Sequence, residues 1–396
     1  MSGQRTDWGR GVPYDPIAGK VAIVGVGEAE HSKASGRSAR EIAGQAIERA
    51  IEDAGLLPEE IDGITFSRGI APFDAKCFHE RFGTSHAMFE SGNGGGMAWA
   101  ATAPAVATPA LPSGRARHVV NVFAVSMATD RDAMTGGPGH FHAAEEMKRN
   151  LEIPYGWFPQ PVYFATIARR HMIEYGTRPE QLGAIAVACR RHANLHPCAV
   201  MRERKLALAD YLASPMLVDP LRMEDCCLIS DGGAAYVMTT PERARDLRKP
   251  PVHAIGVGEG HSDAGLYWAQ QGDFTATPQV FSAPAAFEMA GIAPADVDVL
   301  TLYDPFTIVA LMQIEDMGFC EKGGGGAFVE GSTLHHDGGV LPYNTHGGLL
   351  SHAYVLGISH VVETVRQLRG EAAAQVPGAT VGVYGGYTGA MASTLV

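Results

Sequence analysis

The chain has 396 residues, 46% of them hydrophobic and 19% charged, which is typical of a soluble protein with one large core or two fused cores. The formal net charge of −12 argues against nucleic acid as a partner, because phosphate binding needs a concentrated basic face. The apolar runs are short and the first residues lack the apolar core of a signal peptide, so we expect a cytoplasmic protein without a membrane span.

The first predicted elements alternate between strand and helix. Residues 21–28 (VAIVGVGE) carry a G-x-G pattern without the third glycine of a dinucleotide-binding loop, and we interpret this pattern as a structural turn. In residues 51–67 (IEDAGLLPEEIDGITFS) a helix ends at Ala-Gly, a proline starts a turn, and a β-branched strand follows. A glycine-rich loop, a helix and an apolar strand come next, in residues 91–126.

A middle section, at about residues 126–221, has no counterpart later in the chain, and we predict an inserted loop domain there. It contains His140 and His142, but two histidines followed only by acidic residues make an incomplete metal site. The six cysteines likewise show no C-x-x-C pair and no metal-ligand spacing, so we expect reduced, buried thiols and no bound metal.

The last part of the chain repeats the first. Residues 252–259 (VHAIGVGE) match residues 21–28, and residues 287–303 (FEMAGIAPADVDVLTLY) match residues 51–67 without a gap. From His346 onward, a glycine-rich loop, a helix and an apolar strand follow again. Three matches in one order predict two similar α/β halves, at residues 1–250 and 251–396, with the helix after each glycine loop buried between two sheets.

Four motifs add a family resemblance to this duplication: DCCLISDGGAAYVMTTPERA (225–244), TLYDPFT (301–307), NTHGGLLSHAYVLG (344–357) and VYGGYTGAMAS (383–393). Together they resemble the thiolase superfamily, specifically its lipid-transfer-protein (sterol-carrier-like) branch. The resemblance implies a duplicated α/β fold in a five-layer αβαβα arrangement with an inserted loop domain.

The chain departs from the thiolase pattern at the residues that carry thiolase chemistry. In the stretch FESG, Phe89 stands where the resemblance places the nucleophilic cysteine, and the C-terminal glycine loop YGGYTG has no cysteine. Tyr354 matches the histidine of the G-H-P motif, and Tyr303 matches the first position of the N-E-A or H-D-C motif. Without a thiolate, no acyl-enzyme can form by the usual route.

Thiolases cleave or form the bond between the α and β carbons of an acyl-CoA. A retro-aldol cleavage breaks that same bond without a nucleophile, because it needs only a proton acceptor and a donor at the enolate oxygen. The resemblance extends to aldolases of this branch that remove steroid side chains as CoA thioesters, so we predict Tyr303 and Tyr354 as the catalytic pair. Which phenol accepts the proton and which stabilises the enolate stays open. Other candidates for the cleft or for orienting the phenols are Asp304, His352, His346, Phe89, Glu90 and Tyr384.

Two other functions stay open from the sequence. One is an acyltransferase or thiolase with an atypical nucleophile, for which Cys77 or Cys227 would have to lie in the cleft. The other is a carrier that binds acyl-CoA or lipid without catalysis. Basic groups at 190–191, 202–205 and 243–249 are candidates for contacts with CoA phosphates, although such runs are usually solvated.

The resemblance also implies partners. CoA is expected as part of the substrate, with no separate cofactor. A homodimer is expected, together with a small partner protein that combines an OB-fold with a zinc ribbon. The chain itself lacks zinc-ribbon cysteines, so that domain would come from a separate protein.

Overall fold

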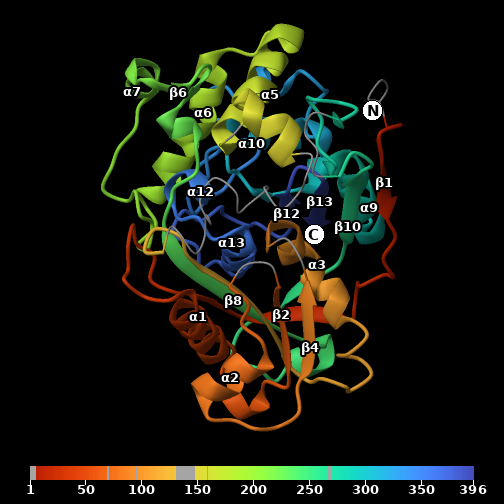
Figure 1. The fold of residues 1–396 in the computed structure, drawn as a ribbon. Coiled ribbons are helices and arrows are strands. Elements are labelled where there is room, and N and C mark those ends of the chain that lie inside the picture. Colours follow the sequence, from red (N-terminus) through yellow and green to blue (C-terminus); the bar gives the residue numbers. More distant parts are fainter. Residues whose placement is uncertain (1–5, 69–70, 94–95, 131–147, 158, 266–269) are drawn as a thin grey trace.

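The computed structural model describes residues 6–68, 71–93, 96–130, 148–157, 159–265 and 270–396 (Figure 1). His140 and His142 lie outside the described residues, as does part of the predicted insertion. No helix in the described part of the chain combines the length and the apolarity needed to cross a membrane.

Two sheets form the frame of the molecule. The first has the order β4-β3-β5-β8-β2-β9, with bounds Phe89–Asn93, Gly63–Ser67, Val119–Ser126, Asp231–Thr239, Val21–Glu28 and Val252–Ala254. The second has the order β1-β10-β13-β12-β11, with bounds Gly9–Val12, Val257–Ser262, Met391–Leu395, Gly382–Tyr387 and Val299–Leu302.

The two sheets share one topology. The order β3-β5-β8-β2 in the first sheet corresponds to β11-β12-β13-β10 in the second. In each set the first pair is parallel and the other pairs are antiparallel. The predicted duplication is therefore confirmed. The division of the chain at residue 250 stays a prediction. Two edge strands pair across this division: β1, which precedes residue 250, pairs with β10 of the second sheet, and β9, which follows it, pairs with β2 of the first sheet.

Helices complete the five layers (Figure 1). Helix α1 (Ala39–Ala54) covers the outer face of the first sheet beside α2 (Ala75–Phe82), and α9 (Gln279–Ala290) covers the outer face of the second. Helices α3 (Gly96–Ala107) and α13 (Ile358–Arg369) lie between the sheets, as the sequence predicts for the helices that follow glycine loops. Polar residues are few in α3, which suits a helix with sheets on both sides.

The first copy of the G-x-G pattern lies within β2, and the second runs from the link between β9 and β10 into β10, which corrects its interpretation as a turn. Gly27 in β2 and Gly258 in β10 face the helices that cover them. A Cβ atom at Gly27 would lie 2.4 Å from the Ala46 carbonyl oxygen, and one at Gly258 would lie 2.0 Å from that of Ser282. The repeat therefore preserves close packing of α1 and α9 on their sheets, for which only glycine leaves room.

The described part of the insertion is mainly helical. It contains α5 (Gln160–Tyr175), α6 (Pro179–Ala193), α7 (Leu208–Ala213) and a hairpin of β6 (Met216–Val218) and β7 (Leu221–Arg222). Helices α5 and α6 pack on α10 (Thr307–Asp316), which is buried along its whole length. The remaining helices are short: α8 (Pro241–Ala244), α11 (Gly325–Phe328), α12 (Gly348–Ser351), the 3-10 turns Pro58–Glu60, Ile153–Tyr155, Met223–Asp225 and Pro294–Asp296, and the π-turn Lys148–Glu152.

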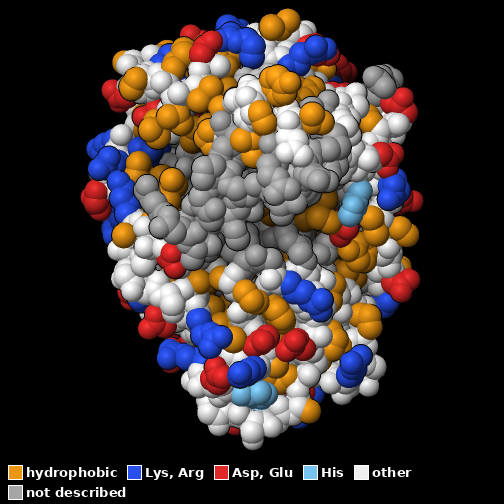
Figure 2. Space-filling view, in the orientation of Figure 1, with side chains coloured by type: hydrophobic (Ala, Val, Ile, Leu, Met, Phe, Trp, Pro, Cys, Tyr) orange, Lys and Arg blue, Asp and Glu red, His pale blue; other side chains and the backbone are white. Residues whose placement is uncertain are grey.

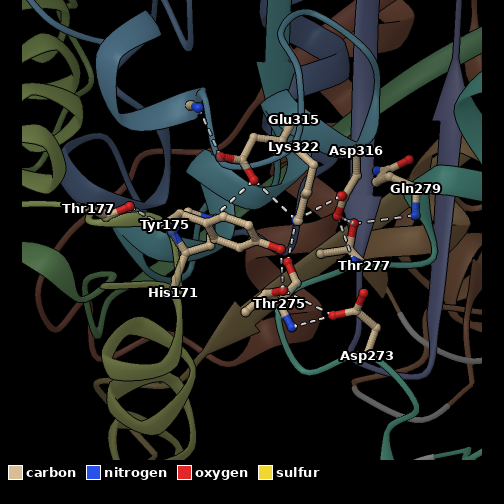
Figure 3. Close-up of polar contacts among 11 residues, drawn as sticks. His171, Tyr175, Thr177, Asp273, Thr275, Thr277, Gln279, Glu315, Asp316 and Lys322 are labelled. Carbon is tan, nitrogen blue, oxygen red and sulfur yellow. Dashed lines mark hydrogen bonds and ion pairs between the residues drawn. The ribbon is translucent and has the colours of Figure 1, made fainter. Parts of the chain in front are cut away.

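A buried ionic network fixes the C-terminal end of α10 (Figure 3). The Lys322 ammonium lies 3.1 Å from the Glu315 carboxylate and 3.0 Å from the Asp316 carboxylate, and both carboxylates are fully buried. His171 of α5 approaches Glu315 at 3.1 Å, and Thr277 donates to Asp316. One buried cation thus pairs with two adjacent carboxylates, whose other contacts join α10 to the insertion and to the segment before α9.

The first prediction concerns this network. Lys322→Met should lower the free energy of unfolding by about 3–5 kcal/mol, because two buried carboxylates lose their cation. Lys76→Met is the matched control, since the ammonium of Lys76 is 82% exposed and pairs with Glu80 on the surface, where such pairs contribute about 0–1 kcal/mol. Equal thermal unfolding temperatures for the two variants would show that the network does not stabilise the fold.

Candidate active site

Two buried tyrosines meet hydroxyl to hydroxyl. The phenol oxygens of Tyr303 and Tyr354 are 3.3 Å apart. Tyr303 directly follows β11, and Tyr354 lies between α12 and α13. Both side chains are buried, with 4% and 6% of their surface exposed. The pair predicted from the sequence is therefore brought together, from two loops of the second half.

Tyr303 is held through its backbone by the strand beside it and the helix after it. Its backbone N–H donates to the Gly385 carbonyl of β12 at 2.8 Å. Its carbonyl accepts from Gln313 Nε2 of α10 at 2.8 Å. The ionic network at the end of α10 thus helps to fix Tyr303, because α10 carries the side chain that binds its backbone.

The segment Cys226–Ser230 links the loops that carry the two tyrosines. The Cys227 N–H donates to the Pro305 carbonyl at 2.8 Å, two residues after Tyr303. The Leu228 N–H donates to the Leu349 carbonyl at 3.0 Å in α12. Ser230 Oγ accepts from the Tyr354 N–H at 2.8 Å. Ser230 was not predicted to hold the backbone of Tyr354, although it lies in the motif at 225–244 that carries the resemblance.

Glycines allow the backbone near Tyr354 to approach a carboxylate. Gly347 and Gly348 have φ angles of +109° and +61°, which favour glycine. A Cβ atom at Gly348 would lie 2.1 Å from Asp304 Oδ2. The Asp304 carboxylate accepts from the Leu349 N–H at 2.8 Å at the start of α12 and lies 3.2 Å from His360 Nε2.

A large cavity reaches Tyr354. Its volume is about 1130 Å³, and it lies between the insertion and the loops of the second half. Its walls are mostly apolar, and on the face shown in Figure 2 hydrophobic side chains gather around the inserted helices. The lining residues that bear on chemistry are Arg190, Arg204, Lys205, Cys226, Cys227 and Tyr354.

Burial keeps both phenols protonated. Burial, together with Tyr354 and the Cys227 thiol, raises the pKa of Tyr303 well above its usual value. Burial and the Cys227 thiol also raise the pKa of Tyr354, although the hydrogen bond with Tyr303 partly opposes this. At neutral pH both hydroxyls are therefore hydrogen-bond donors, and the structure gives no support for a phenol with a depressed pKa.

Three residues expected to orient the phenols make other contacts. Among the described residues, the Asp304 carboxylate accepts from the Leu349 N–H and the Cys189 thiol and lies beside His360 Nε2, and none of these contacts is with Tyr303 or Tyr354. His352 Nε2 lies 3.6 Å from Glu28 Oε1. The His346 ring lies against the rings of His352 and His360, at 4.9 and 4.6 Å between centroids. These side chains are buried behind the loops, so direct orientation of the phenols by them is not observed.

Phe89 and Glu90 lie in edge strand β4, and the described lining of the large cavity includes neither residue, so a role for them at the cleft stays a prediction. The Phe89 ring packs against the Arg115 guanidinium, 5.4 Å from the ring centroid. The Glu90 carboxylate accepts from the Ala75 N–H at 3.0 Å, at the first turn of the outer helix α2. Helix α3 begins only at Gly96, because the strand continues to Asn93.

Tyr384 has a packing role. Its hydroxyl donates to the Met97 carbonyl of α3 at 2.6 Å. It also touches the backbone at Gly357, where a Cβ atom would lie 2.0 Å from the hydroxyl oxygen. The residue therefore ties the central helix α3 to the second sheet.

A cysteine does lie in the cavity. Cys227 lines it, as the alternative with an atypical nucleophile requires. Burial, the Cys226 thiol and the Asp304 carboxylate raise the pKa of the Cys227 thiol, so the thiol stays protonated at neutral pH. A protonated thiol is a poor nucleophile. Cys77 lies in α2, on the outer side of the first sheet.

Comparisons with known proteins identify the family. The family model "Thiolase C-terminal domain-like" matches residues 259–396. The chain is 34% identical to the steroid side-chain-cleaving aldolase of Thermomonospora curvata, covering 89% of this chain and 91% of that protein. It is 33% identical to the 17-hydroxy-3-oxo-4-pregnene-20-carboxyl-CoA lyase of Mycobacterium tuberculosis, covering 91% of this chain and 95% of that protein.

A solved structure shows the same similarity. The structure of the Ltp2–ChsH2 (DUF35) aldolase superimposes with a TM-score of 0.86 at 31% identity, covering 96% of this chain and 98% of that chain. The chain therefore belongs to the thiolase superfamily and is one of its aldolases, a carbon–carbon lyase on a duplicated thiolase fold.

Proposed function

We propose that this protein cleaves a β-hydroxyacyl-CoA by a retro-aldol reaction, releasing a ketone and a shorter acyl-CoA without a covalent acyl-enzyme. The observation that carries the proposal is the pair of protonated phenols, 3.3 Å apart, beside a large cavity that holds no activated thiol among its described lining residues. The substrate proposed is a steroid side-chain thioester, which the similarity to two steroid-processing lyases supports.

The reaction moves one proton from the β-hydroxyl group to the α carbon as the bond between the α and β carbons breaks. One phenol accepts the β-hydroxyl proton while it passes its own proton to the other phenol. The second phenol donates to the enolate and delivers a proton to the α carbon. Atoms and charge balance over this relay, and neither phenol has to exist as a stable phenolate. That suits two buried hydroxyls whose pKa values are raised.

The cavity suits a bulky thioester with an anionic end. Its apolar walls include Leu217, Met223 and Ile229, which fit a fused-ring hydrocarbon. Arg190, Arg204 and Lys205 lie in the same lining, and we assign CoA phosphate binding to these three. Arg190 is 6% exposed, and its Nε donates to Ser351 Oγ at 2.9 Å in α12, so it would connect CoA binding to the loop of Tyr354.

The second prediction tests the phenol pair. Tyr303→Phe and Tyr354→Phe should each lower kcat by roughly 10²–10³-fold, because each removes a preorganised donor at the reacting atoms. Turnover is measured as release of the shorter acyl-CoA from a β-hydroxyacyl-CoA, with the thermal unfolding temperature recorded in parallel.

Tyr236→Phe is the matched control. The Tyr236 hydroxyl is equally buried but donates to the Ala100 carbonyl at 2.9 Å, away from the pair. This variant should lose some stability, about 1 kcal/mol, and keep its kcat. Wild-type kcat in either Tyr303→Phe or Tyr354→Phe would remove that residue from the mechanism.

A second function is favoured by one observation, the presence of Cys227 in the cavity. An acyltransferase that used this thiol would form a thioester between Cys227 and the acyl group. The third prediction is that Cys227→Ser keeps kcat within about a factor of ten, and that mass spectrometry of the protein quenched during turnover finds no added acyl mass. An acyl adduct that Cys227→Ser abolishes would establish the acyltransferase.

We also propose that the protein works in the cytoplasm as a homodimer bound to a small OB-fold protein with a zinc ribbon. Strand β4 ends the first sheet and has β3 as its neighbour on one side, so its other edge could pair with a second copy. The neighbour solved as an Ltp2–ChsH2 (DUF35) aldolase supports a partner of the DUF35 kind.

The fourth prediction tests these partners. Light scattering of the purified chain should give twice the mass of 41.9 kDa. A pull-down of the tagged chain from its native organism should recover a small zinc-containing protein in a fixed molar ratio to the chain. A monomer at micromolar concentration would exclude the homodimer, and recovery of the chain alone under mild conditions would exclude a stable partner.

A further inference from the structure

A buried group of imidazoles and one carboxylate lies outside the phenol pair. The carboxylate of Glu28, at the end of β2, and ring nitrogens of His196 and His352 all lie within 4.8 Å of one another. All three side chains are buried, with 4%, 4% and 0% of their surface exposed. We propose that these residues, which we name the Glu28 cluster, bind one divalent transition-metal ion such as Zn²⁺.

The cluster has unused ligand atoms. Neither ring nitrogen of His352 has a hydrogen-bond partner among the described residues, although the side chain is fully buried. Buried polar atoms normally have a hydrogen-bond partner. A buried imidazole without one therefore indicates a partner that is not a protein atom, such as a bound ion. The neutral imidazole, which offers a nitrogen lone pair, is the form that binds metals.

One distance between ligand atoms is close to that at a bound ion, and the others are within 4.8 Å. Glu28 Oε1 and His352 Nε2 are 3.6 Å apart. Bonds of about 2.0–2.1 Å at a tetrahedral ion separate its ligand atoms by about 3.3 Å. Imidazole and carboxylate ligands together favour Zn²⁺ and its neighbours over Mg²⁺ or Ca²⁺.

His31 lies beside the cluster, outside the group of ligand atoms that are all within 4.8 Å of one another. Its ring lies 4.6 Å from that of His352. His31 Nε2 lies 3.4 Å from the Gly233 carbonyl, which places the ring proton on Nε2 and leaves Nδ1 with a free lone pair. Nδ1 has no hydrogen-bond partner among the residues that the structure describes.

Two contacts oppose metal binding. Arg366 pairs with the other oxygen of Glu28, and its positive charge weakens the attraction for a cation. His196 Nδ1 accepts from the Cys198 N–H at 3.2 Å, so binding through Nε2 would move the ring proton to Nδ1 and break this hydrogen bond. The site is therefore expected to bind less tightly than a preformed one. A polar cavity of about 300 Å³ reaches Glu28, and its lining also contains Arg49, Arg248, Lys249 and Arg366, whose positive charges further oppose a cation.

The bound ion would join three parts of the chain. Glu28 belongs to the first half, His196 follows α6 of the insertion, and His352 lies two residues before Tyr354. The His352 carbonyl already accepts from the Val200 N–H at 2.8 Å. A metal in the Glu28 cluster would thus fix the loop of Tyr354 without taking part in the chemistry.

The fifth prediction tests metal binding directly. Untagged full-length protein, stripped with a chelator, is titrated with Co²⁺ and followed by its visible absorption. We expect one equivalent to bind with the intense bands of a tetrahedral site, and Zn²⁺ to displace it. His196→Gln and His352→Gln should each weaken binding by roughly tenfold or more.

His253→Gln is the matched control, since this exposed histidine lies outside the cluster and should leave binding unchanged. Wild-type protein that takes up no Co²⁺ overturns the proposal, as do two cluster variants with wild-type affinity. If a variant fails to fold, X-ray absorption of the wild-type cobalt protein decides. Imidazole scattering supports the site, and oxygen ligands alone refute it.

Discussion

The arrangement of the site depends on the burial of two phenol hydroxyls against each other. Burial raises both pKa values, so the hydroxyls stay protonated and can act as donors to an enolate oxygen. The same burial would make a phenolate or a thiolate costly at this place, and the Cys227 thiol in the same cavity is accordingly also protonated. A proton relay that creates no lasting charge is the chemistry that such an environment favours.

The duplicated fold explains how two tyrosines from distant parts of the chain come to lie 3.3 Å apart. Tyr303 follows β11, and Tyr354 precedes the central helix α13, so both lie where the second half meets the insertion. The segment Cys226–Ser230 then fixes both loops, through the N–H groups of Cys227 and Leu228 and through the side-chain hydroxyl of Ser230.

The sequence predicted the fold well because its signals are repeated. The matched segments 51–67 and 287–303 became equivalent helix–strand units, and both helices that follow glycine loops lie between the sheets. The G-x-G pattern was misinterpreted, because a glycine needed for close helix packing and a glycine needed for a turn look alike in sequence. The sequence also did not show that Phe89 and Glu90 lie in an edge strand, since the glycines after them obscure where the strand ends and α3 begins.

The residues around the phenols were harder to predict than the phenols themselves. Family positions identified Tyr303 and Tyr354, but the partners of Asp304, His346 and His352 depend on which segments pack behind the loop. Sequence spacing also gave no sign of a metal site, because Glu28, His196 and His352 are separated by more than a hundred residues at each step. Ligand spacing reveals sites built on one local motif, whereas a site that joins three segments becomes visible only when the fold brings them together.

The two sides of the loop 344–357 therefore have different functions. Toward the cavity it presents Tyr354 and Leu350, and on its other side it presents His346 and His352 to a buried polar cluster. A reacting side chain needs a fixed position, and a loop with glycines at positive φ has little intrinsic rigidity. The contacts behind the loop must supply that rigidity. Histidines that touch no substrate can in this way still determine how well the phenols are placed.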